Sequence, residues 1–192
     1  MRGTAAGILP GEAPVVTPDP LTLEMADQLG RSLLRARLRL ATAESCTGGG
    51  LAYALTAVAG SSQWFERGFV TYSNEAKQEM LSVPLETLRT DGAVSEQTAA
   101  SMAIGALVHT PADLAVAITG IAGPDGGTPE KPVGTVCLGW ARRGGETRTA
   151  TAHFDGDRRA VREQSILMAL QGLLDLVEAP APLEKETGRR VD

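Results

Sequence analysis

Residues Thr42 to Gly50 read TAESCTGGG, and they link two apolar segments of different character. The preceding residues, 38–43, form a short apolar run that predicts a strand. The following residues, 51–58, are rich in alanine and predict a helix. A strand, a glycine turn and a helix in succession are the basic unit of an α/β sheet. A serine on such a turn lies near a helix N-terminus, where backbone N–H groups stabilise an oxyanion or a phosphate.

The composition is that of a single globular α/β domain. Of the 192 residues, 43% are hydrophobic and 21% are charged, which is enough for a core. No window approaches the roughly 20 apolar residues of a membrane-spanning helix, and the N-terminus lacks the pattern of a secretory signal. We therefore expect a cytoplasmic location. The formal net charge of −5 argues against a general nucleic-acid-binding surface.

The cysteines and histidines do not predict a metal site. Cys46 and Cys137 lie far apart without zinc or disulfide spacing, and His109 and His153 are isolated. A metal site needs three or four convergent ligands. We expect no metal and no cofactor.

The rest of the chain alternates between predicted helices and strands, which favours a three-layer α/β/α domain. LAVAIT at 114–119 is typical of a buried strand in a parallel sheet, and the last two strands flank a glycine turn typical of a β-hairpin. We therefore expect a mixed sheet that includes a C-terminal antiparallel hairpin. The domain should cover residues 21–177, between a flexible leader at 1–20 and a flexible tail at 178–192. The predicted helices are 21–37, 51–58, 75–81, 85–89, 95–107 and 157–177, and the predicted strands are 38–43, 69–72, 114–119, 134–141 and 147–154.

Polar segments follow three of the predicted strands, at residues 44–50, 72–77 and 119–128. Ligands of open α/β sheets bind at the carboxyl ends of the strands, so we expect these segments to form one site. The glycines of 119–128 match neither GxGxxG nor GxxxxGK[ST], which argues against a dinucleotide or an ATP site. Their spacing suits a backbone cradle of another kind.

Ser45 is a candidate nucleophile, and Thr47 is a candidate donor to a ligand, although both residue types are also ordinary helix caps. A serine nucleophile needs a base, and Lys77 is the candidate, because serine–lysine pairs are a known variant of the serine–histidine arrangement. Lys77 shares a predicted helix face with Met80 and Leu81, so its stem should be packed on apolar surface. Burial would lower the lysine pKa. The alternative is a surface lysine whose amine stays in water.

Two further groups of residues are candidates for ligand contacts. Tyr72 precedes the predicted Lys77 helix and is placed to donate a hydrogen bond or to stack on an aromatic ligand; an ordinary strand-end tyrosine is the alternative. Three arginines fall in the first turns of the last helix. Because arginine is unfavourable at a helix N-terminus, they indicate an anionic partner, and a solvated basic face is the alternative. They are Arg158, Arg159 and Arg162.

Five segments, in this order, resemble the C-terminal domain of the CinA family, the nicotinamide-nucleotide amidases also called PncC. They are TAESCTGG, GFVTYSNEAK, GAVSEQTA, AITGIAGPDGGTPEKPVGTV and FDGDRRAVR. The resemblance spans about residues 21–177. It implies hydrolysis of nicotinamide mononucleotide to nicotinic acid mononucleotide and ammonia, a step of pyridine nucleotide salvage. It also implies a small-molecule nucleotide partner, no nucleic acid or membrane partner, and a homodimer or larger homo-oligomer.

The resemblance also implies roles for the residues singled out above. Ser45 would attack the amide carbon, and Lys77 would take its proton and later pass one to the departing ammonia. Tyr72 would assist by hydrogen bonding or by ordering the site. Backbone N–H groups after the serine would receive the oxyanion, and the third loop with one or more arginines would hold ribose and phosphate. The substrate-binding residues implied in this way are Cys46, Thr47, Gly48, Gly49, Thr119, Gly120, Arg158, Arg159 and Arg162.

Two departures and three alternatives accompany this interpretation. Gly50 stands where a larger apolar residue is expected, which predicts a looser helix start. Longer family members carry an N-terminal domain associated with pyrophosphatase activity on ADP-ribose, an activity that we do not expect here.

Cys46 ranks below Ser45 as a nucleophile, since no adjacent cation is evident. A non-catalytic mononucleotide-binding or regulatory module linked to competence and DNA damage responses, and an amidase for another amide, stay open.

Overall fold

The computed structural model describes residues 17–179, so most of the leader predicted at 1–20 and of the tail predicted at 178–192 lies outside the described residues. One mixed sheet has the strand order β2-β1-β3-β4-β5. β1 is parallel to both of its neighbours, whereas β4 and β5 continue the sheet in antiparallel pairs. The strands are β1 (Leu40–Glu44), β2 (Phe65–Val70), β3 (Leu114–Gly120), β4 (Thr135–Arg142) and β5 (Thr147–His153).

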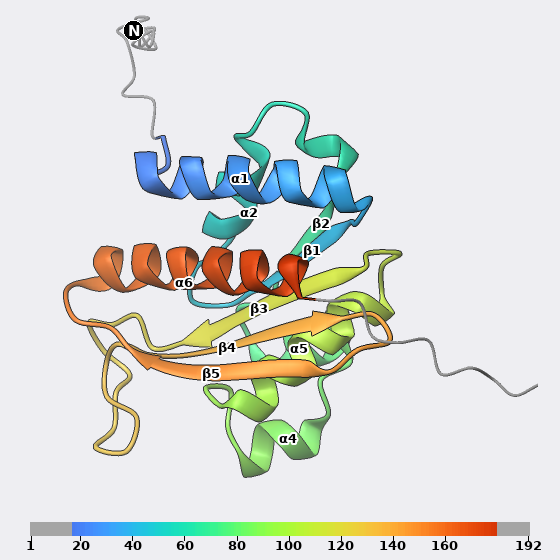
Figure 1. Ribbon diagram of the computed structural model, residues 1–192. Helices are drawn as coiled ribbons and strands as arrows, with labels where there is room; N and C mark the ends of the chain where they lie inside the picture. Colours follow the sequence, from blue (N-terminus) through green and yellow to red (C-terminus); the bar gives the residue numbers. More distant parts are fainter. Residues whose placement is uncertain (1–16, 180–192) are drawn as a thin grey trace, which may run out of the picture.

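Helices cover both faces of this sheet (Figure 1), which confirms the predicted three-layer α/β/α domain with its C-terminal hairpin. None of the helices between residues 17 and 179 combines the length and the apolar character needed to cross a bilayer. On one face lie α1 (Pro20–Ala36), α2 (Gly50–Thr56) and α6 (Arg158–Glu178); on the other lie α3 (Asn74–Leu81), α4 (Leu85–Thr90) and α5 (Glu96–Val108), and the 3₁₀ helix η1 (Ser61–Gln63) precedes β2.

The two faces of the sheet differ in the size of their side chains, because alternate residues of a strand point to opposite faces. The face under α1 and α6 presents large side chains, and the face under α5 presents alanines and a glycine. A Cβ at Gly139 would lie 2.6 Å from the carbonyl oxygen of Ala99, so α5 packs directly on the backbone of the sheet. The large residues include Leu40, Leu114, Val116, Ile118 and Leu138, and the alanines are Ala41, Ala43, Ala115, Ala117 and Ala141.

The short 3₁₀ helix η1 was not predicted, and the α-helices and strands begin and end within two residues of their predicted bounds with one exception. The strand predicted at 69–72 is wrong in position, since β2 covers Phe65–Val70 and Tyr72 lies in the loop that follows. β2 is an edge strand that pairs with β1 alone among the described strands. Its exposed residues include Arg67, so the sequence lacks the apolar run that marks a buried strand.

Candidate active site

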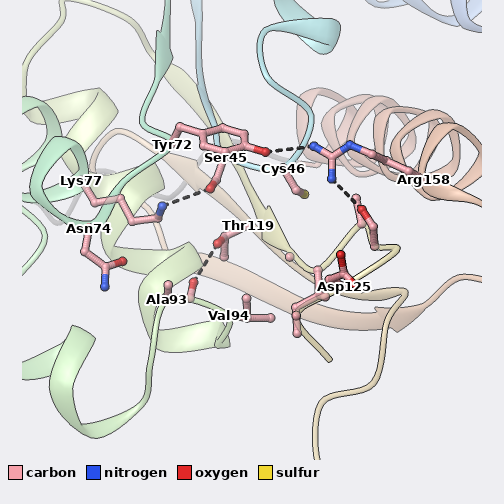
Figure 2. Close-up of a pocket in the computed structure, with 15 residues that line it drawn as sticks. Ser45, Cys46, Tyr72, Asn74, Lys77, Ala93, Val94, Thr119, Asp125 and Arg158 are labelled. Atoms are coloured by element: carbon pink, nitrogen blue, oxygen red, sulfur yellow. Dashed lines mark hydrogen bonds between the residues drawn. The ribbon is translucent and has the colours of Figure 1, made fainter. Parts of the chain in front are cut away.

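A pocket of about 280 Å³ opens at the carboxyl edge of the three parallel strands (Figure 2). The segments that follow β1, β2 and β3 all line it, as the three polar segments of the sequence predict. β1 lies between β2 and β3 in the sheet. The chain segments that follow adjacent parallel strands lead to opposite faces of the sheet at such a point, and a crevice forms between them at the carboxyl ends. The lining comprises Ser45, Cys46, Tyr72, Asn74, Lys77, Ala93, Val94, Arg158 and residues 119–123, 125 and 126.

Ser45 follows β1 directly and is held by the sheet. Its N–H donates to the carbonyl oxygen of Ile118 at 2.9 Å, which continues the pairing with β3 by one residue. The chain then turns through Gly48 and Gly49, whose φ angles of 60° and 90° favour glycine, and α2 begins at Gly50. The serine side chain is 8% exposed and borders the pocket.

Lys77 reaches Ser45 from the neighbouring loop and helix. Its Nζ lies 3.0 Å from Ser45 Oγ and 2.9 Å from the carbonyl oxygen of Thr71, both in buried surroundings. The residue is 1% exposed and forms no ion pair with a carboxylate in the described part of the chain. Burial lowers the pKa of Lys77 from its ordinary value of 10.5. The surface-lysine alternative is therefore wrong; of the two apolar neighbours predicted for its stem, Leu81 is buried and Met80 is 41% exposed.

Cys46 lines the pocket beside the serine but stays a thiol. Burial raises its pKa to about 11, and this effect outweighs the opposite influence of Arg162 and Lys77. Two basic side chains thus influence the thiol, although no adjacent cation was evident from the sequence. A thiolate nucleophile is disfavoured because the deprotonated fraction near neutral pH is very small.

Arg158 and Tyr72 form the rim of the pocket opposite the buried pair (Figure 2). Arg158 Nη1 donates to the carbonyl oxygen of Gly123 at 2.8 Å, and Nη2 donates to the Tyr72 hydroxyl at 2.9 Å. Tyr72 is 62% exposed. The hydroxyl of Tyr72 is thus bonded to Arg158, whereas the hydroxyl of Ser45 is bonded to Lys77.

The structure separates the three arginines that the sequence grouped together. Arg158 alone of the three lines the pocket. Arg159 is exposed and pairs with Glu163 one turn along α6, at 2.7 Å. Arg162 Nη2 donates to the carbonyl oxygen of Thr47 at 2.7 Å, on the side of the serine loop (residues 45–49) that faces away from the pocket. Because successive helix positions point in different directions, neighbouring arginines do not share one target.

Three of the predicted contacts in the serine loop also lie outside the pocket lining. Thr47 is fully buried, and its hydroxyl donates to Glu44 Oε2 at 2.7 Å. The N–H of Gly48 donates to the carbonyl oxygen of Ser45, and that of Gly49 donates to Glu44 Oε2, each at 3.0 Å. These two amides already have acceptors within the protein, and Cys46 is the residue after Ser45 in this segment that borders the pocket.

Thr119 and Gly120 do line the pocket, but the hydroxyl of Thr119 forms a hydrogen bond within the protein. It donates to the carbonyl oxygen of Ala93 at 2.7 Å (Figure 2). Lys131 Nζ donates to the carbonyl oxygen of Val94 at 2.7 Å. Both bonds hold the wall that the segment before α5 adds to the pocket, a wall that sequence reasoning missed because its residues are small and apolar.

Sequence reasoning also missed the role of Glu44. Glu44 is 1% exposed, and its carboxylate accepts hydrogen bonds from the turn and from the start of α2. An acid at the end of an apolar strand and directly before a helix start is the signal that points to such a cap. A Cβ at Gly50 would lie 3.0 Å from Ile166 Cδ1, so a larger residue at this position would press on the end of the Ile166 side chain.

The fold and the pocket define a class of protein: an α/β domain with a buried serine–lysine pair at the carboxyl edge of its parallel strands. The model of the CinA C-terminal domain matches residues 22–177, and the chain belongs to this family.

Relatives of known name and structure agree with this assignment. The chain is 54% identical over 155 residues to the nicotinamide-nucleotide amidohydrolase PncC of Escherichia coli K12, a match that covers 81% of this chain and 94% of that protein. It is 51% identical over 158 residues to the PncC protein of Pseudomonas putida, covering 82% and 98% respectively. The crystal structure of the competence/damage-inducible protein CihA from Agrobacterium tumefaciens aligns with a TM-score of 0.81 at 46% identity, covering 83% of this chain and 98% of that one.

Proposed function

We propose that this chain is a nicotinamide-nucleotide amidase that hydrolyses nicotinamide mononucleotide to nicotinic acid mononucleotide and ammonia, as a step of pyridine nucleotide salvage. The observation that carries the proposal is the distance of 3.0 Å between Ser45 Oγ and Lys77 Nζ at the bottom of a pocket. The names of the relatives support the same substrate.

The first half of the reaction forms an ester on Ser45. A neutral Lys77 amine donates one N–H to the Thr71 carbonyl and keeps its lone pair for the serine proton. As Oγ bonds to the carboxamide carbon, the proton passes to Nζ, and the carbonyl electron pair moves onto the oxygen. When the C–N bond breaks, Lys77 returns the proton to the nitrogen, and ammonia leaves.

The second half consumes water and restores both side chains. A water molecule attacks the ester carbon and gives one proton to Lys77 Nζ. The bond between the carbon and Ser45 Oγ then breaks, and the serine recovers its proton from the lysine. The sum is one amide and one water converted to one carboxylic acid and one ammonia, with no metal or redox step.

The remaining lining residues account for the other parts of the nucleotide. The N–H of Cys46 is assigned to the oxyanion, since it follows the nucleophile directly. Arg158 on the rim supplies the charge for the phosphate, and Tyr72 holds the guanidinium and offers its ring to the pyridine. Thr119 and Gly120 border the space between these ends, where the ribose would lie.

A silent nucleotide-binding module is less well supported, because the burial of an unpaired lysine costs stability that binding alone does not require. The purified protein incubated with nicotinamide mononucleotide should release ammonia in step with nicotinic acid mononucleotide. Nicotinamide riboside and free nicotinamide, tested in parallel, separate this substrate from other amides. Binding of the mononucleotide by calorimetry without release of ammonia would reject the enzyme.

A further inference from the structure

The serine loop, residues 45–49, is gripped from one side by Glu44. Both carboxylate oxygens of this residue are used: Oε2 accepts from the Thr47 hydroxyl at 2.7 Å and from the amides of Gly49 and Leu51 at 3.0 and 3.1 Å. Oε1 accepts from the amide of Ala52 at 2.8 Å. The carboxylate therefore joins the loop to the first turn of α2 in the buried interior.

Arg162 holds the same loop from the other side. Its Nη2 reaches from α6 to the carbonyl oxygen of Thr47 at 2.7 Å, so Thr47 is bonded through its side chain to Glu44 and through its backbone to Arg162. The same nitrogen would lie 3.8 Å from a Cβ at Gly48 and 3.9 Å from one at Gly50. These are ordinary contact distances, so the guanidinium lies beside both glycines at the back of the loop.

Glu44 is also connected to the base. Its carbonyl oxygen accepts from the N–H of Thr71 at 2.8 Å, and the carbonyl oxygen of Thr71 accepts from Lys77 Nζ at 2.9 Å. One residue therefore fixes the loop that carries the nucleophile and the segment that holds the base. Neither Glu44 nor Arg162 lines the pocket.

We propose that Glu44 and Arg162 are positioning residues that keep Ser45 Oγ within reach of Lys77 Nζ. The proposal assigns Arg162 a role other than phosphate binding, and its kinetic consequences rest on the proposed amidase function. Effective attack requires reacting groups in a narrow range of positions, and a displacement of about 1 Å costs about a hundredfold in rate. The proposed substrate contacts of Tyr72 and Arg158 do not depend on the hydrogen bonds of Glu44 and Arg162 to the serine loop.

Glu44→Gln tests the carboxylate with almost no change in shape. Four donors face its two oxygens, so an amide NH₂ group must point at one or more of those donors. We expect kcat to fall by about a hundredfold with KM within about threefold. Arg162→Ala should lower kcat by about tenfold, and Arg162→Lys, which keeps a donor, should recover part of that loss.

Matched controls are Glu24→Gln and Arg31→Ala, which make the same changes at exposed positions of α1. Both should keep the wild-type kcat and KM. Where Glu44→Gln does not fold, Thr47→Val removes one of the four donors and should lower kcat by about tenfold. The proposal is overturned by a variant that folds and keeps its kcat, or by one whose whole loss lies in KM.

Deuterium uptake by the amides of residues 44–52 gives a second readout that needs no turnover. Glu44→Gln and Arg162→Ala should each raise uptake there and leave the amides of β4 and β5 unchanged. If the wild type releases no ammonia from nicotinamide mononucleotide but uptake rises as stated, the amidase is wrong and the grip on the loop stands. If the wild type is active and uptake does not change, the positioning role is wrong.

Discussion

The two ends of the pocket are built in opposite ways. At the inner end, Ser45 and Lys77 are 8% and 1% exposed, and they contact each other directly. At the outer end, Tyr72 is 62% exposed, and Arg158 reaches it across the surface. Ser45 follows the internal strand β1 and Lys77 lies on α3 after β2, whereas Arg158 is the first residue of α6.

We expect this difference to separate chemistry, at the inner end, from substrate recognition, at the outer end. Exclusion of water lowers the pKa of Lys77 and strengthens each electrostatic contact with a developing charge. A charged contact in water is weaker and exchanges readily with solvent, which suits the capture and release of a nucleotide. Changes at the inner end should therefore act on kcat, and changes at the outer end should act on KM.

Ser45→Ala should give the largest effect. It removes the nucleophile, so kcat for release of ammonia should fall by at least about 10⁴-fold, while the dissociation constant for nicotinamide mononucleotide stays within about threefold. Ammonia release and calorimetry measure the two quantities. Cys46→Ala is the matching variant: if it were the inactive one and Ser45→Ala kept its rate, the thiol would be the nucleophile.

Lys77→Met should lower kcat by about 10³-fold, because the serine proton loses its acceptor. In the wild type, kcat/KM should rise with pH as Lys77 loses its proton, and the midpoint of the rise should lie below pH 10.5, because burial lowers the pKa from that value. The variant should lack this limb. A wild-type profile without it, or one shared by the variant, contradicts the role of the base.

The same titration affects stability. The folded state holds the Lys77 proton less firmly than the unfolded chain, whose lysine keeps the ordinary pKa of 10.5. Between the lowered pKa and 10.5 the unfolded chain binds more protons, so the free energy of unfolding should rise with pH in that window. Lys77→Met should remove this part of the pH dependence, which denaturant titrations at several pH values would measure.

The inner end could be predicted from the sequence because its chemistry is local. Ser45 lies on a strand–turn–helix segment, and Lys77 lies a few residues after the next predicted strand. Parallel strands bring their carboxyl ends to one edge, so the two loops meet without further information. The three-layer fold followed from the same alternation of buried strands and amphipathic helices.

The features that sequence reasoning misplaced depend on contacts beyond the reach of a short sequence pattern, or lack an apolar pattern. Whether Arg158 or Arg162 faces the pocket depends on the rotation and position of α6 relative to the serine loop. Glu44 caps amides up to eight residues away, which a search for short motifs does not detect. The strand predicted at 69–72 was misplaced relative to β2, because an edge strand with exposed polar residues has no apolar run in its sequence.

Arg158→Ala should raise KM for nicotinamide mononucleotide by about tenfold to a hundredfold, with kcat within about threefold, since a charge-assisted hydrogen bond to the phosphate is lost. Nicotinamide riboside, which has no phosphate, provides the control. The variant should treat the riboside as the wild type does, so the preference for the nucleotide shrinks. An equal loss on both substrates would place Arg158 in a structural role.

Arg159→Ala should have the smallest effect and tests the outer end most finely. Arg159 lies beside Arg158 in sequence but points into solvent, where it pairs with Glu163. KM should change by less than about twofold, because the loss of an exposed charge is largely screened by water and salt. Steady-state assays at two salt concentrations measure this. The alternative is that the combined charge of the arginines in the first turns of α6 attracts the phosphate, without a direct contact from Arg158. In that case KM of the variant would exceed the wild-type KM tenfold at low salt and equal it at high salt.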